Sequence, residues 1–162
     1  MGARNPGHLK TFDYRGRYRY SLTWCTDARM PRFTTREHVD LVYGQILRSA
    51  AEEGAAILAY CFMPDHLHLL LEMRSDASDC LRFISRAKQY SGFHYHQKFG
   101  DRLWQRYGYE HVLRRDEEIL LTAGYIFENP VRAGLAREAD AYPFLGSEVY
   151  SVKEVLGVFW SG

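Results

Sequence analysis

Two apolar segments separated by only two residues constrain the fold of this chain more than any other feature. Segments 55–63 and 66–72 are rich in aliphatic and aromatic residues, and Pro64 and Asp65 lie between them. Apolar runs of this length are typical of strands, and Pro and Asp are common turn residues. A connection this short joins two strands as an antiparallel hairpin. The sequence therefore predicts an antiparallel sheet built around this hairpin.

The second strand of the hairpin carries two histidines on one face. Alternate side chains of a strand point the same way, so His66 and His68 project together and the neighbouring leucines point to the opposite face. Two imidazoles side by side on a rigid strand supply half of a divalent-metal site. Many such pairs are structural, so the pair alone leaves both interpretations open.

A segment with a helical pattern follows further along the chain. Asp116 is a good N-cap, and Glu117 and Glu118 suit the positive end of a helix dipole. Five apolar residues then have the spacing of one buried helix face: Ile119, Leu120, Ala123, Ile126 and Phe127. The pattern predicts a helix that packs one face against the rest of the protein.

Tyr125 lies on the other side of this helix. At about 100° per residue it falls roughly 160° from the middle of the apolar face, which predicts an exposed tyrosine. Asn129, one turn later, shares the face of Tyr125. Pro130 disfavours a helical Asn129, which is therefore expected in the last turn or just past it. Glu128 beside it is open to two interpretations, an additional metal contact or a solvent-facing side chain.

The composition indicates one globular domain in a reducing compartment. The chain has 162 residues, of which 46% are apolar and 25% charged. Its three cysteines are odd in number and lack C-x-x-C spacing, which argues against a disulfide framework or a thiolate zinc site. No apolar run reaches the length of a membrane span. We therefore expect a cytoplasmic, nucleoid-associated protein.

The net charge of +1 hides an asymmetry along the chain. Residues 1–115 hold 18 Lys and Arg against 12 Asp and Glu, whereas residues 116–162 hold 3 against 8. The segment 80–115 interleaves its cations with Phe, Tyr and Trp. Cations for phosphates and aromatic rings for unstacked bases are what a single-stranded nucleic acid channel needs. A solvated helix face with core aromatics explains the same composition equally well.

Start and stop signals place the remaining elements. Residues 18–26 have strand composition. A capping box at Thr34 to Glu37 opens a helix that buries Val39, Val42, Ile46 and Ala50 and ends at Gly54. A second helix runs from about 79 towards 98, with Leu81, Ile84 and Ala87 on one face, and a strand covers 109–114.

The resulting order, β-α-β-β-α-β followed by an extra helix with the tyrosine, predicts an α+β fold. Its ferredoxin-like arrangement has an antiparallel sheet with helices on one face. We expect a single domain over 1–162, with a loose basic arm at 1–16, a catalytic core at 17–134 and a C-terminal extension at 135–162. The apolar residues 155–160 of that extension, which include Val155 and Trp160, are expected to clip onto the core.

Five blocks in this order resemble one known family. They are TWCT at 23–26, MPDHLHLLL at 63–71, WQRYGYEH at 104–111, YIFENPVRAG at 125–134 and DAYPF at 140–144. Each block is weak alone, but the set resembles the single-tyrosine HUH transposases and, within them, the REP-associated tyrosine transposases. The resemblance spans most of the chain, from about residue 18 to 146.

The resemblance implies a site and a reaction. His66 and His68 match the two metal-ligand histidines, Asn129 matches the third ligand, and Tyr125 matches the nucleophile. In the family the tyrosine attacks single-stranded DNA, forming a 5′-phosphotyrosine bond and a free 3′-hydroxyl, with Mg²⁺ or Mn²⁺ as cofactor. The activity implied here is that of a metal-dependent DNA nicking and joining enzyme.

The same resemblance implies recognition of a DNA hairpin with a short single-stranded guide beside it. We expect contacts from the 1–19 arm and the 80–115 segment: Arg17, Arg19, Arg82, Arg86, Lys88, Arg106, His111 and Arg114. The alternatives are a non-catalytic, domesticated protein that binds hairpin DNA or RNA, and a metal-dependent hydrolase without a covalent step. The sequence leaves open whether the protein is a monomer or a homodimer with a shared site.

Overall fold

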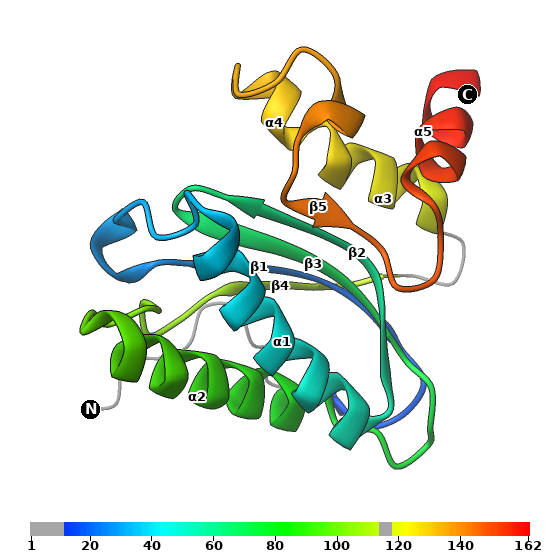
Figure 1. Ribbon diagram of the computed structural model, residues 1–162. Helices are drawn as coiled ribbons and strands as arrows, with labels where there is room; N and C mark the ends of the chain where they lie inside the picture. The colour runs from blue at the N-terminus through cyan, green and yellow to red at the C-terminus, as the bar shows by residue number, and fades with distance from the viewer. Residues whose placement is uncertain (1–11, 114–117) are drawn as a thin grey trace.

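A computed structural model describes residues 12–113 and 118–162 as an α+β fold around one sheet (Figure 1). The five strands lie in the order β4-β1-β3-β2-β5, and each pair of neighbours is antiparallel. The strands are β1 (Arg19–Cys25), β2 (Ala55–Met63), β3 (His66–Met73), β4 (Tyr109–Val112) and β5 (Leu145–Gly146). The predicted antiparallel sheet and element order are confirmed, and the two-residue β5 is an addition that the sequence did not predict.

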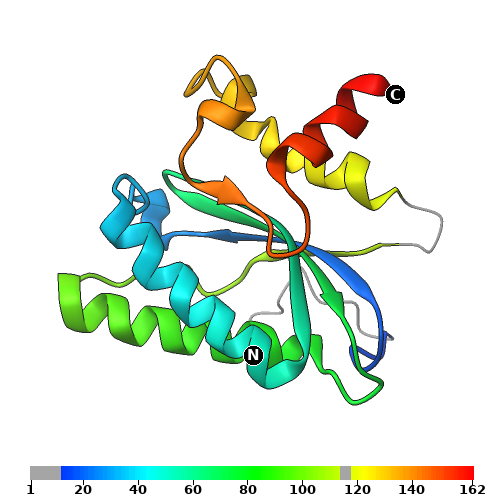
Figure 2. The same ribbon diagram turned by 45° about the vertical axis from the view of Figure 1, so that its right-hand side comes forward.

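Helices cover both faces of the sheet. Helices α1 (Arg36–Glu53) and α2 (Cys80–Phe99) lie on one face, as expected. Three further helices lie on the opposite side (Figure 2): α3 (Ile119–Phe127), α4 (Asn129–Arg132) and α5 (Val152–Ser161). There are also two short 3₁₀ turns: η1 (Asp27–Arg29) lies between β1 and α1, and η2 (Ala139–Ala141) lies between α4 and β5. The sheet therefore separates two apolar clusters, a larger one under α1 and α2 and a smaller one under α3 and α5.

The hairpin formed as predicted and fixes the histidine strand in the middle of the sheet. Met63 of β2 is opposite His66 of β3, so the turn is Pro64 and Asp65 alone. On the other side of β3, Cys25 is opposite His66 and Thr23 is opposite His68. Residues directly opposite each other in an antiparallel pair share a face. The two histidines therefore have Thr23 and Cys25 beside them on the sheet.

The helix ends agree with the capping signals of the sequence, except that the N-cap of α1 lies one residue later than predicted. Gly54 and Gly100 end α1 and α2 in the left-handed conformation (φ 65° and 82°). The N-cap of α1 is Thr35, whose side chain accepts a hydrogen bond from the His38 amide, so the capping box predicted from Thr34 is wrong by one residue. Glu37 instead forms an ion pair with Lys98 of α2.

The predicted buried faces are largely confirmed. Val39, Val42, Ile46 and Ala50 of α1 are buried, and Leu120 is the one half-buried member of the predicted α3 face. Leu81 of α2 is 36% exposed, so its assignment to the buried face is wrong. Phe83 takes that place, because the side of α2 that meets the sheet and α1 carries Cys80, Phe83, Ile84 and Ala87.

The N-terminal segment is more tightly packed than expected where the structure describes it, and the C-terminal helix is less so. Tyr14 is buried and stacks on Tyr20, so residues 12–16 are not a loose arm, and residues 1–11 lie outside the described part of the chain. In α5, Val155 is fully buried, as predicted for a clip on the core. Trp160 is 70% exposed, so that part of the prediction is wrong, because α5 turns only one side towards α3.

Candidate active site

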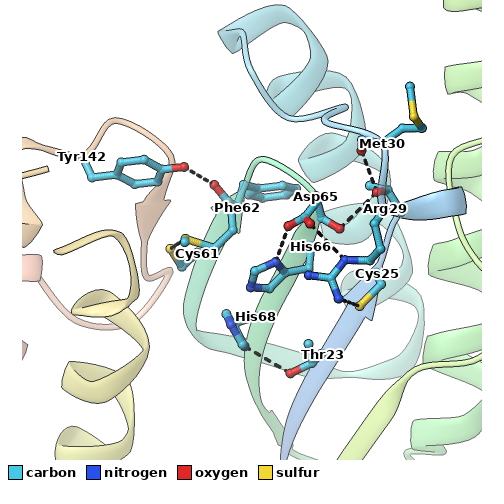
Figure 3. Close-up of polar contacts among 12 residues, drawn as sticks. Thr23, Cys25, Arg29, Met30, Cys61, Phe62, Asp65, His66, His68 and Tyr142 are labelled. Atoms are coloured by element: carbon cyan, nitrogen blue, oxygen red, sulfur yellow. Dashed lines mark hydrogen bonds and ion pairs between the residues drawn. The ribbon is translucent and has the colours of Figure 1, made fainter. Parts of the chain in front are cut away.

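His66 and His68 lie side by side on β3, as the strand periodicity predicts (Figure 3). Their ring centroids are 4.8 Å apart and the ring planes are nearly perpendicular, at 87°. Both side chains are only partly buried. The pair therefore presents two imidazoles from a rigid central strand to the space above the sheet.

Each ring is fixed by a hydrogen-bond partner at Nδ1. Nδ1 of His66 lies 2.7 Å from Oδ1 of Asp65, and Nδ1 of His68 lies 3.1 Å from Oγ1 of Thr23. A partner at one ring nitrogen sets the ring orientation and leaves the other nitrogen to bind a metal ion. The ligating atoms would therefore be the two Nε2 atoms.

Burial keeps His68 neutral. Desolvation, with smaller contributions from the charges of His66 and Arg132, lowers the pKa of His68 to about 4. An imidazole binds a metal ion only in its neutral form. The site thus offers a ready ligand at neutral pH.

Asp65 is itself held in place by the loop that follows β1. Its Oδ2 accepts a hydrogen bond from Nε of Arg29 at 3.0 Å, and its backbone carbonyl accepts bonds from the amide and hydroxyl of Thr26 (Figure 3). Burial opposes ionisation of Asp65, but the hydrogen bonds from Arg29 and His66 outweigh it and lower the carboxyl pKa. Asp65 is therefore an ionised support for His66.

The backbone of this loop is strained. Ala28 and Arg29 have φ values of 53° and 54°, in the left-handed region that side-chain-bearing residues rarely adopt. Such residues persist where surrounding contacts hold them, and they cluster at functional sites. The Arg29 to Asp65 ion pair is one such contact.

Tyr125 lies on the exposed side of α3, as the helical periodicity predicts, with 61% of its surface accessible. The same α3 packs its other side onto β2 and β3, the strands of the histidine hairpin. Arg132 of α4 contacts Tyr125 directly. Its Nη2 donates to the Tyr125 carbonyl at 2.8 Å, and its Cζ lies 4.0 Å from the centroid of the Tyr125 ring.

Asn129 is the first residue of α4, just past the end of α3, in agreement with the expectation from Pro130. Its Nδ2 donates to the Ile126 carbonyl at 3.1 Å, which leaves Oδ1 as the atom suited to a metal ion. Glu128 is only 7% exposed, so the alternative of a solvent-facing carboxylate is wrong.

The donor types suit an exchangeable divalent ion. In residues 12–113 and 118–162, no three His, Cys, Asp or Glu side chains form a group that could hold a metal ion. The proposed ligand set consists of two imidazoles and one amide oxygen, so it does not require three side chains of these types. A set without thiolates or clustered carboxylates favours a weakly held ion over structural zinc.

The arginines expected to contact DNA fall into separate places. Arg17 and Arg19 line a pocket of about 720 Å³ together with Arg74, at the end of β1 and β3 remote from the hairpin turn. His111 is exposed on β4, where its partner on β1 is Ser21. Arg19, Ser21 and Thr23 are two positions apart on β1 and share a face, so Arg19 and His111 lie on the face of the histidine pair.

The other predicted contacts lie in the α2 layer. Lys88 and Arg106 line a second pocket of about 420 Å³, and burial lowers the pKa of Lys88. Arg82 and Arg86 form ion pairs with Glu53 of α1, at 2.9 and 3.3 Å. Arg114 lies outside the described residues. DNA contact at all of these positions stays a prediction.

Three residues of the site were not predicted from the sequence. They are Asp65, expected only as a turn residue, Arg29 and Arg132. The linear signal for Arg132 was its place a few residues after Tyr125, within the block at 125–134. Arg29 had no comparable signal, because its partner Asp65 is 36 positions away.

The comparison with known protein families agrees with this arrangement of an exposed tyrosine on a helix that packs against a His-x-His strand. The chain belongs to the IS200-like transposase family, whose model matches residues 15–126. No helix in the described residues is long and apolar enough to cross a membrane.

Two relatives within this family point to one branch of it. A candidate REP-associated tyrosine transposase of Haemophilus influenzae is 27% identical over 116 residues, covering 65% of this chain and 66% of that protein. The REP-associated tyrosine transposase of Escherichia coli is 22% identical over 155 residues, covering 93% and 91%. The resemblance to the REP-associated branch is thus confirmed.

Two solved structures share the fold. A REP-associated tyrosine transposase bound to a REP hairpin superposes with a TM-score of 0.71 at 19% identity, covering 86% of this chain and 81% of that one. A candidate transposase from Deinococcus radiodurans gives a TM-score of 0.52 at 22% identity, covering 67% and 88%.

Proposed function

We propose that this protein nicks and joins single-stranded DNA through a covalent bond between Tyr125 and a 5′-phosphate. The observation that carries this proposal is the exposed phenol of Tyr125 on α3, a helix packed against the β2 and β3 hairpin that bears the histidine pair. Arg132 links the two, because it stacks on Tyr125 and its charge acts on His68. In the proposed site, the nucleophile and the metal ligands belong to the same chain.

The reaction transfers a phosphodiester without net hydrolysis. The Tyr125 oxygen loses its proton and attacks phosphorus, the bond between phosphorus and the 3′-oxygen breaks, and that oxygen takes up a proton. The product is a 5′-phosphotyrosine linkage and a free 3′-hydroxyl. Because the new linkage is again a phosphodiester, the 3′-hydroxyl of a second strand can reverse the step without ATP.

The residues present fit a Mg²⁺ or Mn²⁺ ion, which would supply electrostatic stabilisation of the attacked phosphate. Nε2 of His66, Nε2 of His68 and Oδ1 of Asn129 would hold it. Asp65 and Thr23 orient the two rings, so that the ligating atoms need not be rearranged on binding.

We propose a DNA hairpin as the substrate, in line with the relative that was solved with a REP hairpin. The net charge of +1 makes bulk attraction weak, so recognition depends on shape and on local cations. Replacing Arg82, Arg86 and Lys88 with Gln should lower hairpin affinity and reduce the salt slope of binding. An unchanged slope would show that the hairpin contacts another surface.

The deciding experiment uses end-labelled single-stranded hairpins from repeats of the source genome, with Mn²⁺ or EDTA, on denaturing gels. Wild type should give a Mn²⁺-dependent, protein-linked 5′-phosphate that Tyr125→Phe does not form. Tyr109→Phe is the matched control, since Tyr109 is also 61% exposed. Tight binding without any adduct would support the non-catalytic hairpin binder. Cleavage that survives Tyr125→Phe would support a metal-dependent hydrolase.

A further inference from the structure

Arg132 contacts the proposed nucleophile, and its charge acts on one histidine of the pair. Its guanidinium lies 4.0 Å from the Tyr125 ring centroid and donates from Nη2 to the Tyr125 carbonyl. Its charge also contributes to lowering the pKa of His68 on β3 and acts on Cys61, the residue opposite His68 on β2. The cation therefore contacts Tyr125 directly and acts electrostatically on groups of β2 and β3.

The contacts of Arg132 leave it able to bind a ligand. A guanidinium has five N–H donors, and the bond to the Tyr125 carbonyl uses Nη2. The residue is exposed, and its Cζ lies over the Tyr125 ring, 4.0 Å from the centroid. The remaining N–H donors can reach an anion that approaches Tyr125 from solvent.

We propose that Arg132 binds the phosphate attacked by Tyr125 and stabilises the negative charge that builds up on its non-bridging oxygens. The inference rests on the proposed function, because the reacting phosphate must lie between the Tyr125 oxygen and the ligands on β3. Guanidinium matches a phosphate with two parallel hydrogen bonds, and such bonds are strong where charge develops. The stacking contact keeps the ring and the cation together.

A purely structural role for Arg132 makes different predictions. Arg132 also satisfies a carbonyl at the C-terminal end of α3, and capping of this kind stabilises a helix. If capping were its whole role, its loss would lower the melting temperature and would leave the ionic component of single-strand binding unchanged.

The experiment compares Arg132→Gln and Arg132→Lys with Arg137→Gln, an exposed arginine further along the chain that serves as a control. Adduct formation should slow by about 100-fold or more in Arg132→Gln, as on loss of one donor to a developing oxyanion. Arg132→Lys should recover part of the rate, because it keeps the charge without the planar fork. Arg137→Gln should match wild type.

Binding is measured separately in the cleavage-blocked Tyr125→Phe protein. With a single-stranded oligonucleotide that spans the cleavage junction, adding Arg132→Gln should reduce the slope of log K against log salt by about 0.7, the value for one phosphate contact on a single strand. Affinity for the isolated hairpin stem should stay as in the parent, and the melting temperature should fall by no more than the loss of one capping hydrogen bond explains. An unchanged slope and rate, or a fall in melting temperature with an unchanged slope, would overturn the inference.

The two proposals fail in different ways. If wild type forms no adduct on any substrate, the proposed chemistry is wrong, and the salt slope of the Tyr125→Phe protein still tests the phosphate contact. If wild type forms the adduct and Arg132→Gln does so at the same rate, only the role of Arg132 is wrong.

Discussion

The two histidines of the candidate site have different supports, although they lie two positions apart on one strand. His66 is bonded to a carboxylate that is itself paired with Arg29, whereas His68 is bonded to the Thr23 hydroxyl and is the more desolvated ring. A carboxylate partner raises the basicity of a ligand imidazole. The two rings should therefore contribute unequally to metal binding and to the response of the protein to pH.

Replacing Asp65 with Asn should weaken Mn²⁺ binding by about 10- to 100-fold, the usual cost of losing a support of a ligand histidine. Asn keeps the size of the side chain but has one acceptor oxygen in place of two, so the variant loses the negative charge and one of the two hydrogen bonds to Arg29 and His66. Titration of Mn²⁺ followed by electron paramagnetic resonance measures the affinity. Asp76→Asn is the control, because Asp76 pairs with Arg17 and its side chain is 93% exposed. Equal affinities for both variants would contradict a supporting role for Asp65.

His68 should make the metal-free protein less stable as the pH falls. Burial lowers the pKa of His68 from 6.5 to about 4, so the unfolded chain binds the proton more readily. The contribution of His68 to the free energy of unfolding is fully present above pH 6.5. As the pH falls from 6.5 towards 4, this contribution of about 3 kcal/mol is lost.

Urea unfolding in EDTA at several pH values measures this loss. His68→Gln should flatten the pH dependence of the free energy of unfolding between pH 4 and 6.5. A His68→Gln protein with an unchanged pH profile would show that another group titrates in this range.

At the scale of elements, α3 is held from two sides. Its apolar face packs on the sheet, and α5 packs against it at Gly124. A Cβ at Gly124 would lie 2.5 Å from Cβ of Phe159, a distance that side chains do not tolerate. The glycine lets α5 pack directly on the helix that carries Tyr125, and α5 thereby fixes where the phenol lies.

Gly124→Ala should therefore destabilise the protein by about 1–3 kcal/mol, as overpacking does, although alanine favours helix formation. In a Phe159→Ala background the same change should cost less, because the ring atoms at 2.6 and 2.7 Å are removed although the Cβ of residue 159 at 2.5 Å remains. Thermal unfolding of the four proteins measures this double-mutant cycle.

Gly157→Ala is the matched control in α5. A Cβ there meets nothing within 4 Å, so this change should raise the melting temperature. Additive effects of Gly124→Ala and Phe159→Ala would show that α3 and α5 are not in the close contact described.

At the scale of the whole molecule, the two faces of the sheet are covered to different extents. One face is filled by α1 and α2, which form the larger part of the core. Helices α3 and α5 cover part of the other face. Among the described residues, the part of this face along β1 and β4 is left open, and His111 and Tyr109 are exposed there. Because α3 lies on the sheet of its own chain, the geometry favours a complete site within one monomer.

Mixing two inactive proteins tests this arrangement. Tyr125→Phe retains the histidines and His66→Ala retains the tyrosine, so a site shared between two chains would regain adduct formation in the mixture. We expect no adduct above the background of each protein alone, on the same gels. An active mixture would show that α3 is exchanged between subunits, and a sedimentation experiment on wild type would then show a dimer.

The local signals of the sequence determined the elements and the faces of this protein. Periodicity placed His66 and His68 on one face and Tyr125 away from the core, and Gly54 and Pro130 marked where α1 and α3 end. These features depend on residues within a few positions of one another, which is why they can be inferred without a structure. Leu81 and Trp160 were misplaced because both lie beside the buried face of their helix, where only the packing partner decides exposure.

Only the tertiary structure decided which groups meet. The Arg29 to Asp65 ion pair, the action of Arg132 on both Tyr125 and His68, and the contact of α5 with Gly124 each join segments with no common local pattern. Strand β5 is likewise too short for a periodic signal and exists because β2 offers it hydrogen bonds. Contacts of this kind depend on how the two layers settle on the sheet, and that is determined by packing over the whole core.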